Sequence, residues 1–209
     1  MPLMIDLFSG LGGASIPFDR ATWDVLRFDS NPIVLPTQPD TILCDLSSRN
    51  ALESILSAVD GREVDLLWAS PPCTYFSTAN PKRDVERAME LVRITFSLIS
   101  EINPRFHVVE NVHGSIKPIS KEFGTVRQIV GRPFHGAGGF ALWGNFPLLD
   151  MPKGWVHLKD THKLSGDNPL RPWLRSIVPP EIGEALMRAM ATQTTLDDFH
   201  DLVSKRTMS

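Results

Sequence analysis

Four short runs rich in Val, Ile and Leu alternate with polar or helix-forming segments between Leu3 and Val109 of this chain. The runs cover Leu3 to Phe8, Asp24 to Phe28, Val64 to Ala69 and Phe106 to Val109. Strands that alternate with helices in this way typically form a mostly parallel sheet with helices on both faces. The pattern therefore predicts an α/β fold built on a central parallel sheet.

Three helices are predicted around these runs. The clearest covers Val85 to Glu101, where apolar residues recur every three or four positions behind Asp84, a suitable N-cap. The other two cover Asn50 to Val59 and Pro180 to Ala191. From Gly114 to Trp173, frequent Gly and Pro and a fading helical periodicity predict an appendage of short strands and glycine-rich turns.

The composition is that of one globular domain. The chain has 209 residues, of which 42% are hydrophobic and 22% are charged, and this balance excludes wholesale disorder. We expect one domain over residues 1–191 and a C-terminal tail over 192–209, with a short helix from Leu196 to Val203. The net charge of -3 means that a nucleic-acid partner has to be met by a local basic face.

The cysteines and the apolar runs limit the compartment. Cys44 and Cys73 are the only cysteines, and their separation excludes a disulfide scaffold and a cysteine-built zinc site. None of the six histidines has metal-ligand spacing with a carboxylate, so no metal is predicted. No basic stretch precedes the first apolar run, and no apolar run is long enough for a membrane span. We therefore expect a cytoplasmic protein.

A glycine-rich stretch, Asp6 to Gly13, stands where the first strand ends and its helix begins. Glycines at such a turn let a ligand approach the backbone closely. Asp29 follows Gly10 by nineteen residues, at the end of the second run, where a carboxylate can bind both ribose hydroxyls of an adenosine. Asp45 is placed to reach an adenine amino group. The alternative is that the stretch is only a tight turn.

A second stretch, Ser70-Pro71-Pro72-Cys73, follows the third apolar run. Two prolines fix φ and remove two backbone donors, so they predict a stiff loop that holds the Cys73 sulfur at the carboxyl edge of the sheet. A thiol held in this way is a candidate nucleophile, provided that its surroundings favour the thiolate. The alternative is a small, inert, buried side chain.

A third stretch, Val108 to Val112, ends the fourth run with Glu110 and Asn111. Parallel strands deliver their carboxyl ends to one edge of a sheet, so Glu110 is predicted to lie near Cys73. The alternative is that Glu110 caps the following loop and Asn111 satisfies backbone groups.

Taken together, the stretches DLFSGLGG, SPPC and VVENV, in this order and spacing, resemble the cytosine-C5 DNA methyltransferases, and the short phage-type members in particular. The resemblance covers roughly residues 3 to 190. It implies a Rossmann-like fold and methyl transfer from S-adenosylmethionine (AdoMet) to C5 of cytosine. It also implies roles for individual residues.

In that family the SPPC cysteine, here Cys73, attacks C6 of the target base, and the glutamate, here Glu110, holds or protonates N3. Asn111 would brace the loop, and Pro72 would pack beneath a cytosine flipped out of the duplex. The cofactor-binding residues implied are Asp6, Phe8, Gly10, Leu11, Gly12, Asp29, Asp45, Leu46 and Pro71. The stretch from Arg175 to Pro180 resembles a divergent last motif, which folds back beside the cofactor.

The chain departs from the family in two respects. The arginine that helps to hold the cytosine has no clear counterpart, and Arg132 or His135 are the candidates. The target-recognition region is reduced to about residues 148–174, which predicts a short or relaxed recognition sequence. The residues there suited to a polyanion are Lys153, Trp155, Lys159, His162, Lys163, Arg171, Trp173 and Arg175.

The resemblance thus implies a DNA (cytosine-5-)-methyltransferase with AdoMet as cofactor and DNA as partner. We expect a monomer without membrane contact, in a prokaryotic cell or a host infected by a phage or virus. Two alternatives stay open. One is a cytosine-C5 methyltransferase that acts on RNA, and the other is an inactive accessory protein that binds AdoMet or DNA.

Overall fold

A computed structural model describes residues 1–76, 80–131, 139–156 and 169–192. Within these residues, seven strands form one sheet in the order β3-β2-β1-β4-β5-β7-β6. Neighbours among β1 to β5 are parallel, whereas β7 is antiparallel to both β5 and β6. The strands are β1 (Leu3–Leu7), β2 (Asp24–Asp29), β3 (Ile42–Leu43), β4 (Leu66–Ala69), β5 (Phe106–Val112), β6 (Gln128–Val130) and β7 (Phe140–Trp143).

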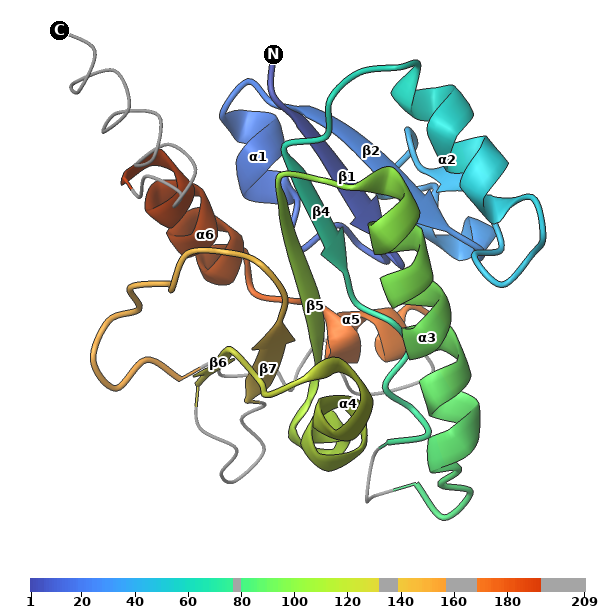
Figure 1. Cartoon of the computed structure of the whole chain (residues 1–209), viewed down its shortest axis with the longest axis vertical. Helices are drawn as coiled ribbons and strands as arrows, with labels where there is room; N and C mark the ends of the chain where they lie inside the picture. The colour runs from blue at the N-terminus through green and yellow to red at the C-terminus, as the bar shows by residue number, and fades with distance from the viewer. Residues whose placement is uncertain (77–79, 132–138, 157–168, 193–209) are drawn as a thin grey trace, which may run out of the picture.

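Helices cover both faces of this sheet (Figure 1). Helices α2 and α3 lie on one face and α1 and α6 on the other. The predicted α/β fold is confirmed, and the order 3-2-1-4-5 is the Rossmann-like one. The helices are α1 (Ile16–Arg20), η1 (Pro32–Val34), α2 (Ala51–Val59), α3 (Val85–Ile102), η2 (His113–Ser115), α4 (Ile116–Phe123), α5 (Arg171–Ser176) and α6 (Pro180–Thr192).

The apolar core is divided by the sheet into two clusters. Side chains of α2 and α3 pack on one face of β1 and β4, around Leu7, Ile55 and Val92. Side chains of α1 and α6 pack on the other face, around Trp68 and Leu186. The central strands are buried on both faces, which explains why they read as continuous apolar runs.

The three predicted helices are confirmed, with ends that differ by one residue at most. The Asp84 side chain accepts a hydrogen bond from the Arg87 amide at 3.1 Å, as expected of the N-cap of α3. The Gly114 to Trp173 region contains the expected short strands, β6 and β7. The predicted helix from Leu196 to Val203 lies outside the described residues.

Helix α4, like the start of α5, lies in the region from Gly114 to Trp173, where short strands and glycine-rich turns are predicted, so that prediction is wrong there. The α4 apolar residues Ile116, Ile119 and Phe123 follow helical spacing and pack toward the α3 side of the core. The helix is short and contains Pro118, but a proline in the first turn removes no intrahelical hydrogen bond.

Among the described helices, none combines the length and apolar character needed to cross a lipid bilayer.

Helix α6 packs on α1 through Gly183. A Cβ placed on this glycine would lie 2.4 Å from the carbonyl oxygen of Ala14 and 3.2 Å from Cγ of Pro17. The absence of a side chain therefore allows the two segments to approach closely.

The substitution Gly183→Ala is expected to lower the free energy of unfolding by about 1–3 kcal/mol, measured by urea or thermal unfolding. In an uncrowded helix, alanine is more favourable than glycine by up to ~1 kcal/mol, so a loss requires the close contact with α1. Arg188→Ala, on the exposed side of α6, is the control and should change stability by less than about 0.5 kcal/mol. Unchanged or increased stability of Gly183→Ala would contradict this packing.

Candidate active site

The turn after β1 has a backbone that glycine permits. Gly10 and Gly12 have φ values of 52° and 72°, and Phe8 has a φ of 57°. A Cβ on Gly12 would lie 2.8 Å from Nε2 of Gln38 and 3.1 Å from Nε of Arg27, so a larger residue does not fit without displacing them. The Gln38 amide also donates to the carbonyl oxygen of Leu11 at 3.1 Å. The side chains of Gln38 and Arg27 therefore pack directly against the glycine turn and support it.

Asp29 ends β2 beside this turn. Its Oδ2 accepts a hydrogen bond from the Gly10 amide at 2.9 Å, and its Oδ1 accepts one from the Asn31 amide at 2.9 Å. A carboxylate has about four acceptor positions, so each oxygen keeps capacity for a further donor. The Ser9 hydroxyl is buried and has no hydrogen-bond partner among the described residues.

Asp45 follows β3 at the same edge of the sheet. Its Oδ1 accepts hydrogen bonds from the amide of Ser47 at 2.9 Å and from its hydroxyl at 2.6 Å. These bonds lower the pKa of this exposed carboxyl group, so it is ionised at neutral pH. The Cys44 amide donates to the carbonyl oxygen of Asp29 at 2.9 Å, which connects the two acidic positions, and Leu46 is buried next to Asp45.

A buried polar network lies beneath the glycine turn. The Ser15 hydroxyl donates to Oδ2 of Asp6 at 2.6 Å, and Nε of Arg27 donates to the Ser15 oxygen at 3.0 Å. Arg27 also forms an ion pair with Asp19. Burial raises the pKa of Asp6 to about 6, although the Ser15 hydrogen bond and the Arg27 charge act in the opposite direction. Asp6 is therefore enclosed under the turn and not on its open side.

The sequence analysis did not identify Ser15 and Arg27. A signal for Arg27 does exist, because a charged residue stands inside the apolar run that becomes β2. A charge in such a run requires a partner on the neighbouring strand, and the register places Arg27 opposite Asp6.

The segment around Trp173 to Val178 returns to the glycine turn. A Cβ on Gly13 would lie 2.1 Å from the carbonyl oxygen of Val178, and one on Gly10 would lie 3.6 Å from Cδ1 of Trp173. The divergent last motif was expected to fold back to this place, and its backbone lies there.

The loop after β4 carries Cys73 at the carboxyl edge of the sheet. Pro71 is buried, Pro72 is exposed and Cys73 is half-buried. The Asn111 amide, at the end of β5, donates to the carbonyl oxygen of Pro71 at 2.9 Å. The Asn111 oxygen accepts from the Val112 amide at 2.9 Å, so this one buried side chain joins the Cys73 loop to the end of β5.

Further contacts hold the rest of this loop. The Arg87 guanidinium lies 4.6 Å from the centre of the Tyr75 ring, and the Asn80 amide donates to the carbonyl oxygen of Thr74 at 2.9 Å. A Cβ on Gly114 would lie 2.8 Å from the carbonyl oxygen of Phe76, so η2 also packs directly on the loop.

Glu110 lies on β5, the neighbour of β4. In the parallel register Ala69 is opposite Val109, so Glu110 stands level with the start of the Cys73 loop. Its side chain is 8% exposed. The strands that lead to Cys73 and Glu110 are thus adjacent and parallel, and the closeness of the two side chains stays a prediction. The alternative for Asn111 holds in part, because its amide does satisfy backbone groups while it braces the loop.

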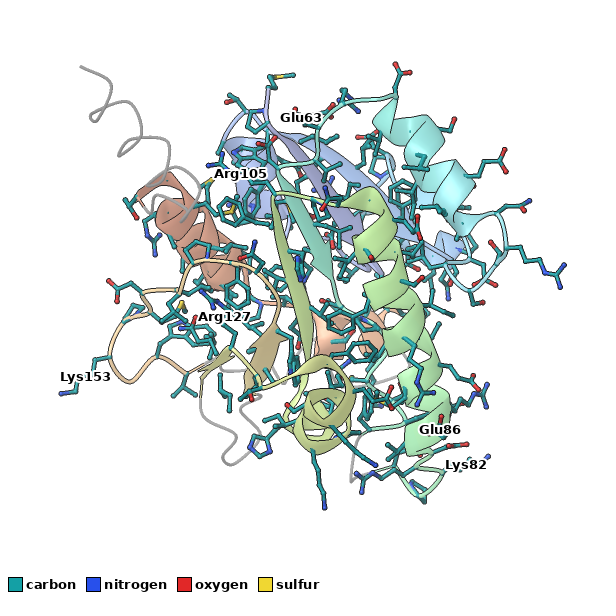
Figure 2. All side chains as sticks on the ribbon, viewed as in Figure 1. Glu63, Lys82, Glu86, Arg105, Arg127 and Lys153 are labelled. Carbon is teal, nitrogen blue, oxygen red and sulfur yellow. The ribbon has the colours of Figure 1, made fainter. Side chains whose placement is uncertain are left out.

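Of the residues proposed to meet a polyanion, the described ones Lys153, Trp155 and Trp173 do not gather in one place. Lys153 and Trp155 line a hollow of about 260 Å³ beside β6, and Figure 2 shows Lys153 projecting away from the rest of the molecule. Trp173 instead lies against Gly10. Arg132, His135, Lys159, His162 and Lys163, and the Arg175 side chain, lie outside the described part. Among the described residues, no group of His, Cys, Asp and Glu is arranged to hold a metal ion.

Comparison with known proteins gives a consistent family. Residues 3–131 match the family of C-5 cytosine-specific DNA methylases. The type II methyltransferase M.XorII of Xanthomonas oryzae is 26% identical over 121 residues, which is 54% of this chain and 28% of the relative. The type II methyltransferase M.AquIA of Picosynechococcus is 32% identical over 123 residues, which is 54% of this chain and 49% of the relative.

A solved structure agrees with these relatives. The crystal structure described as that of a DNA modification methyltransferase encoded within an Escherichia coli prophage is 25% identical, with a TM-score of 0.50. The match covers 69% of this chain and 47% of that protein. This chain thus matches only about half, or less, of the length of each of these proteins.

The buried Asp6 carboxyl predicts a pH-dependent stability. Its pKa is about 6 in the folded chain against 3.8 ordinarily, so between these values the folded state binds more protons and its stability falls as pH rises. Relative to Asp6→Asn, the wild-type free energy of unfolding should decrease by roughly 2–3 kcal/mol from pH 4 to pH 7, measured by urea unfolding.

Asp40→Asn is the control for this measurement, because Asp40 is exposed, and its pH profile should follow that of the wild type. Parallel profiles of the wild type and Asp6→Asn would show that Asp6 is not the buried titrating group.

Proposed function

Because this chain belongs to the family of C-5 cytosine-specific DNA methylases, we propose that it transfers a methyl group from AdoMet to C5 of cytosine in DNA. The observation that carries this proposal is the hydrogen bond that connects the loop after β4 to the carboxyl end of β5. The Asn111 amide holds the Pro71 carbonyl, and so joins the loop of Cys73 to the strand of Glu110. A nucleophile and an acid on such a braced edge fit addition to a pyrimidine ring.

The proposed chemistry divides the work between these two residues. The Cys73 thiolate adds to C6 of the cytosine while Glu110 supplies a proton to N3, so C5 gains the electron density of an enamine. Bound AdoMet supplies the electrophilic methyl group, on its sulfonium. Once C5 carries the methyl group, loss of the C5 proton to a base, return of the N3 proton to Glu110 and release of the Cys73 thiolate restore the aromatic ring and the free enzyme. Both faces of a stacked base are blocked, so this pathway requires that the cytosine be flipped from the duplex.

The glycine turn fits AdoMet at the point where the strand order reverses between β1 and β4. Asp29 has spare acceptor capacity for two ribose hydroxyls, and the unpartnered Ser9 hydroxyl can serve a bound polar group. Asp45 is exposed and ionised, as required to accept from the adenine amino group. Asp6 acts from beneath, by supporting the turn. The remaining proposed contacts are Phe8, Gly10, Leu11, Gly12, Leu46 and Pro71.

The proposed substrate side lies at the same edge. Pro72 is exposed beside Cys73, where it can pack against the flipped base. We propose that residues 1–191 form the catalytic domain and that about residues 148–174 form a reduced recognition region. A region of this size contacts few base edges, so the proposed recognition sequence is short.

Parallel assays of labelled methyl transfer to duplex DNA and to tRNA test the function. Transfer to DNA is the expected result, and mass analysis of the digested product should show 5-methylcytosine. Transfer to tRNA alone would assign the chain to an RNA substrate. AdoMet binding without transfer to either substrate would favour an accessory protein.

Replacement of the proposed nucleophile, Cys73→Ser, should lower turnover by at least ~10³-fold, because a hydroxyl is a much weaker nucleophile than a thiolate. AdoMet affinity, measured by calorimetry, should stay close to that of the wild type. The second cysteine offers a matched control, since Cys44 is buried at the end of β3, and Cys44→Ala should retain turnover. Turnover by Cys73→Ser near the wild-type rate would exclude Cys73 as nucleophile.

Loss of the brace, in Asn111→Ala, should lower kcat roughly 10- to 100-fold, because a displaced loop misaligns the proposed nucleophile. The KM for AdoMet should change less than kcat, since the Asn111 bond reaches only Pro71 among the proposed cofactor contacts. Asn145→Ala removes a comparable amide–carbonyl bond, to Arg105 at 3.3 Å, at the other end of β5 and serves as control. Equal losses in the two variants would indicate a general effect on folding and contradict a positioning role.

A further inference from the structure

Two helices touch the Cys73 loop from different elements. Arg87, in the first turn of α3, lies over Tyr75 of the loop, and Gly114, just before α4, packs on Phe76. Both helices therefore begin beside the loop, and their N-terminal ends carry partial positive charge.

Exposed cations lie around the start of α3 and along α4, with Lys117 in the first turn of α4 and Lys121 in its last turn. We define the α3–α4 rim as the exposed side chains of Lys82, Arg83, Arg87, Lys117 and Lys121. Lys117 and Lys121 are four residues apart on α4 and so share one face of the helix. Figure 2 shows Lys82 at the lower end of α3, and α4 lies at the same end of the molecule. A cation in the first turn of a helix opposes the helix dipole, so this placement of Lys117 is not explained by helix stability.

The acidic residues near the rim are largely occupied. Glu86 and Glu122 both bind the Arg93 guanidinium, and the two carboxylates of this cluster come from different helices. Asp84 accepts from the Arg87 amide as the N-cap of α3. Glu90 lies one turn further along α3, away from the loop. Even with all four of these carboxylates counted as charged, the rim cations together with Arg93 exceed them, so this end of the molecule is positive although the whole chain has a net charge of -3.

The rim is also rigid. The Arg93 guanidinium donates to Glu122 through Nε at 2.9 Å and through Nη2 at 2.7 Å, which fixes α4 to α3. The rings of Phe96 and Phe123 stack 4.1 Å apart at 7° between the same two helices. The cations of α3 and α4 are thus held at a fixed separation, as binding to a regular polyanion requires.

We propose that the α3–α4 rim binds the phosphate backbone of duplex DNA on either side of the cytosine that enters the Cys73 loop. The inference rests on the proposed function and deepens it, because it assigns the DNA-binding surface to α3 and α4. The sequence pointed instead to the cations of residues 148–174 as the DNA-binding residues. Of these, Lys153 lines a hollow beside β6 and projects on a different side of the molecule from the rim. Phosphate contacts position the duplex without reading its sequence. The proposed surface therefore supplies affinity for DNA, and the choice of recognition sequence is left to the proposed recognition region.

The test compares binding of the full chain to a fluorescent 30-base-pair duplex in 50 to 200 mM salt. The double variant Lys117→Gln, Lys121→Gln should bind roughly 10- to 100-fold more weakly at 50 mM salt. Its plot of log affinity against log salt should be less steep by about 2, since each lost phosphate contact removes ~0.9. AdoMet affinity and thermal stability should remain those of the wild type.

Two controls accompany the measurement. Arg20→Gln, Arg188→Gln removes two exposed cations from α1 and α6, on the other side of the molecule, and should leave the salt slope unchanged. Lys153→Gln tests the rival surface and should also bind as the wild type does. A wild-type slope in the α4 double variant, or an equal loss in either control, would overturn the rim.

Binding and methyl transfer separate the two proposals. If the wild type binds duplex DNA but transfers no methyl group, the proposed function fails, while the variants still decide the place of the surface. If the wild type shows no salt-dependent binding to the duplex, or binds only tRNA, the rim as a DNA-binding surface is overturned.

Discussion

The parallel pairing of β4 with β5 is the constraint on which the candidate site depends. Cys73 and Glu110 are separated by 36 residues in the chain, and only this pairing brings their strand ends to one edge. The pairing fixes the backbone but not the loop beyond Ala69, which is held by other means. The buried bond from Asn111 to Pro71 removes that freedom, because a buried amide without its acceptor is costly. The end of β5 therefore both carries Glu110 and, through Asn111, holds the Cys73 loop in place.

Much of this arrangement could be predicted from the sequence, because buried parallel strands leave a direct pattern of apolar runs. The ends of β1 and β4, at Leu7 and Ala69, follow from that pattern to within one residue, and so does the common edge, whereas β5 continues beyond its apolar run to Val112. Helix α4 was not predicted, although Ile116, Ile119 and Phe123 follow helical spacing, because three apolar positions in eight residues with an internal proline are a weak signal. The ring stack and the ion pairs that fix α4 join residues from distant parts of the chain, and no local pattern reports them.

Arg27 shows another limit of sequence-based prediction. Its charge was visible inside an apolar run, but its partners Ser15 and Asp19 come from the other side of the glycine turn. An ion at this depth is stable only when it is paired and hydrogen-bonded, and Asp6, Ser15 and Asp19 together meet that condition. The carboxyl group of Asp6 is itself buried, and this burial raises its pKa to about 6 although the Ser15 hydrogen bond and the Arg27 charge lower it. The same buried network therefore supports the glycine turn that we propose to bind the cofactor and influences the pKa of Asp6, which lies beneath that turn.

The net charge of the chain and the α3–α4 rim act together on an approaching duplex. Exposed carboxylates occupy other parts of the surface, among them Glu53, Asp60, Glu63, Glu101 and Asp150. A polyanion is repelled by these regions and attracted by the rim, so the field orients the duplex before contact, over about 10 Å at 0.1 M salt. A uniformly basic chain would attract DNA on every face and hold it mostly in unproductive orientations. A modest negative charge with one rigid positive edge instead favours encounters in which the duplex faces the Cys73 loop.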